Sequence, residues 1–109
     1  MSYCRAFLKA DWLNAATGAA TTSGEDVQGA RDYGLQMSTT GGPTGGAVIL
    51  EGSLDGVNWA ELASVNIALA GVGPIAVWAT GRPVKEIRLR LTGLTGGSSP
   101  TLSASAIAA

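Results

Sequence analysis

Histidine is absent from this 109-residue chain, and cysteine occurs only once, at Cys4. A single cysteine has no internal partner for a disulfide, and the lack of histidine removes the commonest general base and the commonest metal ligand. The lone thiol has no candidate base, and the acidic residues show no close pairing apart from Glu25 and Asp26, which lie among Ser and Gly. We therefore expect no enzyme activity, no cofactor, no metal site, and a free Cys4 thiol without a functional role.

Charged residues are scarce as well. They make up 14% of the chain, with seven basic and eight acidic side chains and a net charge of −1. This balance lacks the basic excess of a nucleic-acid-binding protein, so we expect no nucleic-acid partner. A small domain has a large surface relative to its volume, and so few charges suggest that part of it is covered by copies of the same protein or by a lattice.

Long apolar runs are missing too. Near the N-terminus, Lys9 and Asp11 interrupt the apolar residues, so no segment there is long enough for a signal peptide or a membrane span. We therefore expect no membrane partner and synthesis in a cytoplasm. The length of the chain fits one domain with a single core.

The pattern that is present is the period-two alternation of β-strands. It is clearest where Ile87, Leu89 and Leu91 alternate with charged residues. Residues 93–100 are rich in Gly and Ser and must turn the chain, and residues 101–106 then alternate again. The C-terminal quarter is therefore predicted to be a β-hairpin.

Further strands are predicted upstream, separated by turns rich in Gly and Pro. Asp55-Gly56 suits a tight hairpin turn, and Trp59 on the returning strand is expected in the core together with the apolar residues of 87–91. Short strands at spacings of about ten residues indicate an all-β fold, an antiparallel β-sandwich or jelly roll of about seven to eight strands. The upstream strands are expected at residues 33–38, 47–53, 57–62, 65–69 and 75–79.

The N-terminal segment is harder to place, because its Ala-rich stretch is broken by Gly and Thr. We expect a strand and an extended arm in residues 1–31, followed by the sandwich in residues 32–109, as one domain overall. An arm could bury apolar surface on a neighbouring subunit, so deleting residues 1–14 is expected to weaken attachment more than it destabilises the sandwich. The candidate docking residues of this segment are Tyr3, Phe7, Trp12 and Leu13.

Trp78 is a further candidate for partner binding, and two registers are open for its strand. If Ile75 and Val77 face the core, the indole points outward, where it suits a protein interface or a sugar platform. A shift by one residue would bury it instead, which is the commoner state of tryptophan.

Two arginines and one acidic turn also have alternative interpretations. Arg88 and Arg90 lie on the solvent side of their strand, where they could contact an acidic partner or pair with acidic residues of neighbouring strands. Asp55 and Asn58 bring oxygen atoms close to Glu51, but a calcium loop gathers more carboxylates than these two, so a hairpin turn is preferred. The acidic residues considered as partners of the arginines are Glu51, Glu61 and Glu86.

Two segments of the chain resemble small bacteriophage structural proteins with a β-sandwich fold. Residues 50–59 have the form L-E-G-S-x-D-G-x-N-W, which resembles discoidin-like sandwich modules more loosely. Residues 82–100 resemble the strand and Gly/Ser/Pro loop that close those phage proteins. Together the resemblance covers about residues 32–108 and implies a β-sandwich.

The resemblance to capsid decoration, or cement, proteins also implies a function and a location. It implies a protein of the virion, made in the host cytoplasm, that binds the major capsid protein and stabilises the capsid lattice by protein–protein contacts. It implies self-association as a homotrimer, because decoration proteins often occupy local three-fold axes. The alternative is a carbohydrate-binding or host-attachment module of a phage tail or fibre, which needs an exposed aromatic groove with convergent polar groups.

Overall fold

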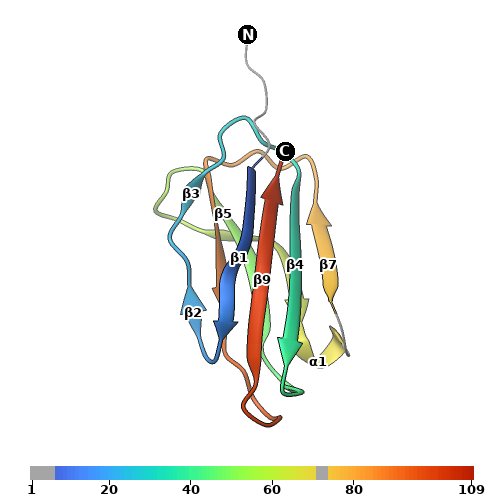
Figure 1. The fold of residues 1–109 in the computed structure, drawn as a ribbon. Coiled ribbons are helices and arrows are strands. Elements are labelled where there is room, and N and C mark those ends of the chain that lie inside the picture. The colour runs from blue at the N-terminus through green and yellow to red at the C-terminus, as the bar shows by residue number, and fades with distance from the viewer. Residues whose placement is uncertain (1–6, 71–73) are drawn as a thin grey trace.

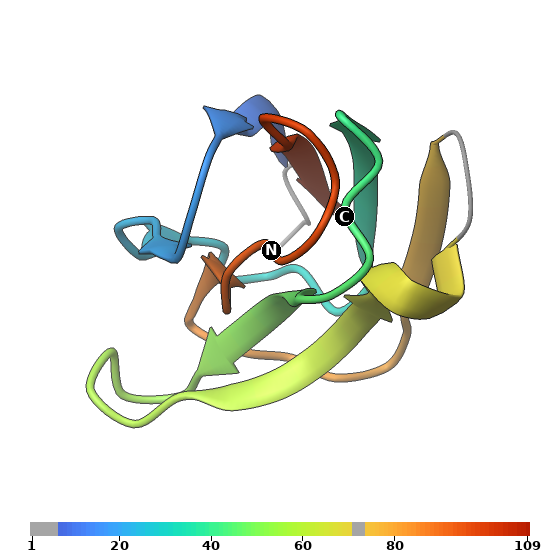
Figure 2. The same cartoon turned by 90° about the horizontal axis from the view of Figure 1, so that it is seen from below.

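The computed structural model describes residues 7–70 and 74–109, and nearly all of its elements are β-strands. One sheet has the strand order β1-β9-β4-β7, and the second has the order β2-β8-β5-β6, with the short strand β3 also paired to β8. The sheets face each other as an antiparallel β-sandwich (Figures 1 and 2), so the predicted fold class is confirmed. The elements are β1 (Phe7–Ala16), β2 (Ala20–Thr21), β3 (Glu25–Asp26), β4 (Tyr33–Thr40), β5 (Ala47–Ser53), β6 (Ala60–Asn66), α1 (Ile67–Ala70), β7 (Ile75–Ala79), β8 (Glu86–Leu91) and β9 (Thr101–Ala108).

The core lies between the two sheets and is filled by alternate residues of their strands. In β8, Ile87, Leu89 and Leu91 are fully buried, as their alternation predicts. Leu50 of β5 joins them from the same sheet, and Leu35 of β4 joins them from the other. Apolar burial of this kind contributes about 25 cal/mol per Å² removed from water, so this layer is the main source of stability.

The alanines near the C-terminus belong to the core. Strand β9 lies between β1 and β4, and Ala104, Ala106 and Ala108 on its inner face are all buried. Their small side chains let bulkier residues of the opposite sheet fill the interior, since the core is close-packed.

The predicted C-terminal hairpin is wrong. Strand β8 belongs to the five-stranded sheet and β9 to the four-stranded sheet, so residues 92–100 carry the chain from one layer to the other. Strand β8 pairs with β5, whereas β9 pairs with β1 and β4. Alternation determines which face of a strand is buried, but it does not identify the neighbouring strand.

The predicted hairpin between β5 and β6 does form, with Gly56 at a φ of 80° in its turn. Strand β6 begins only at Ala60, however, so Trp59 precedes it. The separate strand expected at residues 65–69 is replaced by the end of β6 and the single helical turn α1. No helix in the described residues is long and apolar enough to cross a membrane.

The N-terminal segment contributes to both sheets. Strand β1 is an edge strand that pairs with β9 and buries Leu13, while β2 and β3 pair with β8. Deleting residues 1–14 would therefore remove most of β1. The effect of that truncation on attachment could not be separated from its effect on folding.

Candidate functional site

Four residues form a row across the outer face of the four-stranded sheet. Strand pairing places Leu8 opposite Ile107, Ile107 opposite Gly34, and Gly34 opposite Trp78. Three of them carry large exposed apolar side chains, with relative exposures of 67% for Leu8, 43% for Ile107 and 70% for Trp78. We call these four residues the apolar row. It crosses β1, β9, β4 and β7, which lie side by side in Figure 1.

Gly34 allows the side chains of Ile107 and Trp78 to approach each other above its backbone. A Cβ atom at this position would lie 2.9 Å from Cγ2 of Ile107 and 3.0 Å from Cδ1 and Nε1 of Trp78. These two side chains therefore occupy the space above a residue that has no side chain, and Gly34 itself is buried. An aromatic ring that covers a strand glycine is supported by the sheet beneath it.

The apolar row borders a shallow hollow of about 170 Å³ on the same face, where Gln36 and Ser105 add polar groups. A second hollow of about 180 Å³ continues along the sheet and is lined mainly by polar residues. The face therefore changes from apolar at the row to polar farther along the strands. The polar residues of the second hollow are Asp11, Gln36, Ser38, Ser103 and Ser105.

The structure decides between the two registers of Trp78. Ile75 and Val77 are half-buried, whereas Ala76 and Trp78 are exposed, so the outward register is confirmed and burial of the indole is wrong. Leu8, Gly34 and Ile107 were not among the predicted binding residues. A signal existed for Ile107, because continuing the alternation of residues 101–106 by one step places it on the outer face.

Two of the predicted docking residues near the N-terminus belong to the core region instead. Leu13 is buried, and Trp12 is half-buried and packed against the core, because β1 is a strand of the sheet and not a free arm. Phe7 begins β1 opposite Ala108. Tyr3 lies outside the described residues, as does Cys4.

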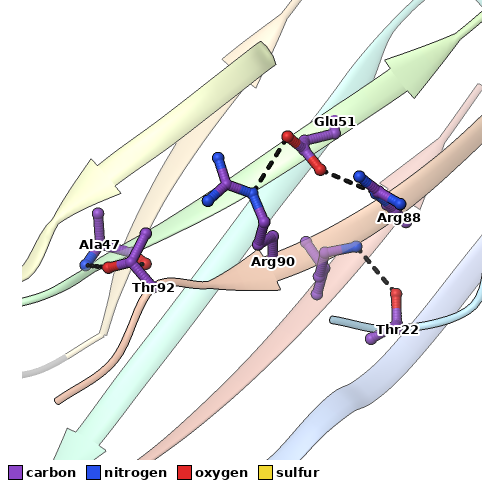
Figure 3. A network of polar contacts seen from close by, with 7 residues as sticks. Thr22, Ala47, Glu51, Arg88, Arg90 and Thr92 are labelled. Atoms are coloured by element: carbon purple, nitrogen blue, oxygen red, sulfur yellow. Dashed lines mark hydrogen bonds and ion pairs between the residues drawn. The ribbon is translucent and has the colours of Figure 1, made fainter. Parts of the chain in front are cut away.

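On the outer face of the five-stranded sheet, Arg88 and Arg90 share one carboxylate (Figure 3). The Nε atom of Arg88 donates to Oε1 of Glu51 at 2.8 Å, and the Nε atom of Arg90 donates to Oε2 at 3.2 Å. Glu51 is buried on β5, while both arginines keep partial contact with solvent. Pairing with an acidic residue of a neighbouring strand is thus confirmed, although one carboxylate offsets only one of the two positive charges.

Trp59 lies beside Arg88 and not in the core. The guanidinium carbon of Arg88 is 4.3 Å from the centroid of the indole ring, which is a cation–π distance. A Cβ atom at Gly24 would lie 2.8 Å from Cη2 of the same ring. The predicted core position of Trp59 is therefore wrong, because the ring is half-buried between Arg88 and the backbone at Gly24.

The loop between β5 and β6 is held by its own polar groups. Asp55 accepts hydrogen bonds from the backbone amides of Val57 and Asn58, from the Asn58 side chain, and from the Ser53 hydroxyl. The amides of Asn58 and Val57 are the main reason that the pKa of Asp55 lies well below its ordinary value of 3.8. The carboxylates of Asp55 and Glu51 both have partners, and the described residues contain no group of three or more His, Cys, Asp or Glu placed to hold a metal ion.

Comparisons with known proteins agree with this fold. Neither the scan against protein families nor the search of curated proteins gives a match. Among solved structures, the chain is similar to the SPBc2 prophage-derived protein YomS, with a TM-score of 0.64 and 11% identity over 99% of this chain and 96% of that one. The PBSX exported protein XepA gives a TM-score of 0.61 and 17% identity over 99% of this chain, which spans 38% of XepA.

A third similar structure is the C-terminal CBM6 of LamC, a laminarinase from Zobellia galactanivorans. Its TM-score is 0.56 and its identity 10%, over 96% of this chain and 100% of that one. Likeness at such low identity establishes the fold and leaves function to the chemistry of the site. The chain is therefore a β-sandwich similar to those of YomS, XepA and the CBM6.

Proposed function

We propose that this chain is a structural protein of a phage virion, a capsid decoration protein that binds the major capsid protein through the outer face of its four-stranded sheet. The apolar row is the observation that carries the proposal. Three large, exposed apolar side chains in one row on a paired sheet form the kind of exposed patch that marks a protein interface. The row needs no catalytic group to act, and the protein is accordingly a binding module and not an enzyme.

The arrangement of the face suits a docking surface. Aromatic side chains are enriched among the residues that dominate binding energy, and they act best when neighbouring contacts exclude water from them. Trp78 lies at one end of the apolar row, with Gln36 and Ser105 close enough to form a polar rim. The backbone beneath the ring is part of a paired strand, so little conformational entropy is lost on binding.

Two further observations support a place in the virion. The similar solved structures include the prophage-derived protein YomS, which this chain covers almost end to end. The segments at residues 50–59 and 82–100 resemble phage structural proteins of the decoration type. The same resemblance is the basis for proposing self-association as a homotrimer and synthesis in the host cytoplasm. The net charge of −1 and the lack of long apolar runs are the basis for proposing no nucleic-acid or membrane partner.

The test is binding to capsids purified from a phage that lacks this protein. We expect Trp78→Ala to lower the affinity for these capsids by at least about tenfold, because it removes the largest exposed anchor. Leu54→Ala is the matched control, since Leu54 is equally apolar and 76% exposed but lies in the β5–β6 loop. Unchanged binding of the Trp78 variant, or no binding of the unaltered protein to capsids, would contradict the proposal.

A carbohydrate-binding module of a tail or fibre is the second candidate, and one observation favours it. Trp78 exposes its indole beside Gln36 and Ser105, so an aromatic face and hydrogen-bonding groups border the same hollow. Titration against an array of bacterial surface glycans separates the two functions. Binding to a glycan that is lost in both Trp78→Ala and Gln36→Ala would establish this candidate, and no glycan binding by a protein that attaches to capsids would exclude it.

A further inference from the structure

The two edges of the four-stranded sheet differ in their regularity. At one edge, the pairing of β1 with β9 shifts register twice, and Asp11 and Ala15 have positive φ angles of 49° and 50°. Their backbone amides donate to the hydroxyls of Ser105 and Ser103, at 2.9 Å in both cases. Bulges of this kind protect an edge strand from pairing with another chain.

The opposite edge, formed by β7, has none of these features. Its five residues, all of them described, pair with β4 in unbroken register from Ile75 opposite Met37 to Ala79 opposite Tyr33. The strand carries no charged residue and no proline. Within residues 7–70 and 74–109, no strand pairs with its outer side. A regular, uncharged edge strand is a template for pairing with another strand.

The sequence of β7 is complementary in size to itself. When I-A-V-W-A is laid antiparallel to a second copy, with Val77 opposite Val77, the two largest side chains each meet an alanine. Ile75 then lies opposite Ala79, and Ala76 opposite Trp78, on both sides of the two-fold axis. Paired residues share a face of the sheet, so the small Ala76 of each copy would lie opposite Trp78 of the other, whose indole leans over Gly34 and away from the shared edge.

We propose that two copies of this chain pair through β7 about a two-fold axis, which makes one continuous eight-stranded sheet from two four-stranded sheets. Such a contact is isologous, because the same strand serves both partners. A ladder of five residues is short, so the dimer is weak and depends on concentration. This dimer is an alternative to the homotrimer implied by the resemblance, and the mass of the assembly distinguishes the two. It is measured without capsids, so its failure would leave the proposed docking function untouched.

Sedimentation equilibrium over a range of concentrations tests the mass of the assembly. The unaltered protein is expected to change from one chain mass to two. Ala76→Glu is expected to weaken the dimer by at least about tenfold, because it places a carboxylate of each copy at the contact, where the two like charges lie on a diagonal and repel. Ala76 is exposed, so this change spares the core. Val57→Glu, at a residue 76% exposed in the β5–β6 loop, is the control and should dimerise normally.

Cysteine cross-linking in a Cys4→Ser background locates the contact independently of any loss of affinity. Val77→Cys should give a disulfide-linked dimer under mild oxidation, because the two Val77 residues lie directly opposite each other in the proposed pairing. Ala76→Cys should not, since residue 76 faces residue 78 and its own copy lies on the diagonal, about 7–8 Å away. A single chain mass at every concentration, a mass of three chains, or a dimer that survives Ala76→Glu without forming the Val77→Cys cross-link would overturn the proposal.

Discussion

Replacing Gly97 with alanine should destabilise the sandwich far more than the same change at Gly42. Both glycines lie in the two Gly-rich loops at residues 41–46 and 93–100, which are joined by a hydrogen bond from the Ser98 amide to the Gly41 carbonyl at 2.8 Å. Their backbones are alike, with φ angles of 73° at Gly97 and 66° at Gly42. The two positions therefore impose similar conformational strain on any residue that has a Cβ atom.

The surroundings of the two glycines differ, and this difference determines how much stability each alanine variant loses. A Cβ atom at Gly97 would lie 2.3 Å from the carbonyl oxygen of Gly41, whereas a Cβ atom at Gly42 has nothing within 4 Å. The left-handed conformation alone should cost about 1–2 kcal/mol in each variant. At Gly97 the backbone of the facing loop must also move, which adds about 1–3 kcal/mol by analogy with overpacking.

Urea unfolding followed by far-ultraviolet circular dichroism measures both changes in the free energy of unfolding. The difference between the two variants isolates the contact between the loops, because the strain in φ is common to both. Equal losses of stability would show that the loops do not constrain each other as the structure indicates. The reasoning would then fail even if each variant were destabilised.

Three further predictions concern the core and the polar contacts. Leu89→Ala should lower the free energy of unfolding by about 2–5 kcal/mol, since this side chain is fully buried, while Leu54→Ala should change it by less than about 0.5 kcal/mol in the same urea titration. Glu51→Ala should lower the free energy of unfolding by about 1–3 kcal/mol, as measured by thermal unfolding. The loss is smaller than for a fully buried ion pair, because Arg88 and Arg90 remain partly solvated. A loss of stability as large at high salt as at low salt would show that charge pairing is not the cause. The pKa of Asp55 is lowered in the folded chain, so its contribution to the free energy of unfolding is present above its ordinary pKa of 3.8 and is lost as the pH falls further. Asp55→Asn should therefore reduce the dependence of stability on pH in this acidic range. An unchanged slope of stability against pH would show that Asp55 is not the group responsible.

Much of the fold was predictable from the sequence, because the alternation of apolar and polar residues shows which face of a strand is buried. Residues 87–91 and 101–106 alternate as half-buried strands do, and the structure buries the expected members of each. The hairpin turn at Asp55-Gly56 was equally predictable, since few residues other than Gly, Asn and Asp tolerate the left-handed backbone conformation that such a turn needs. Local patterns of this kind need only a few neighbouring residues to be recognised.

The pairing of strands was not predictable in the same way. Residues 92–100 look like a hairpin loop, yet they cross between the sheets, and nothing local distinguishes the two outcomes. The apolar row shows the same limit, because it joins residues from four strands that are far apart in the chain. A site assembled by sheet topology becomes visible only when the order of the strands is known.

The two tryptophans on the outer faces of the sandwich, Trp59 and Trp78, show why bulk alone is a poor guide to the core. Trp78 covers Gly34 on one outer face, and the ring of Trp59 lies against Gly24 on the other side of the sandwich. In each case a residue without a side chain leaves a space on the surface that a large ring fills, so the ring gains contacts without entering the interior. The core is built mainly from Leu, Ile, Val and Ala, together with Met37 and with Tyr33, whose hydroxyl donates to the Ala30 carbonyl. The rings remain at the surface, where Trp78 is available to bind a partner and Trp59 supports Arg88.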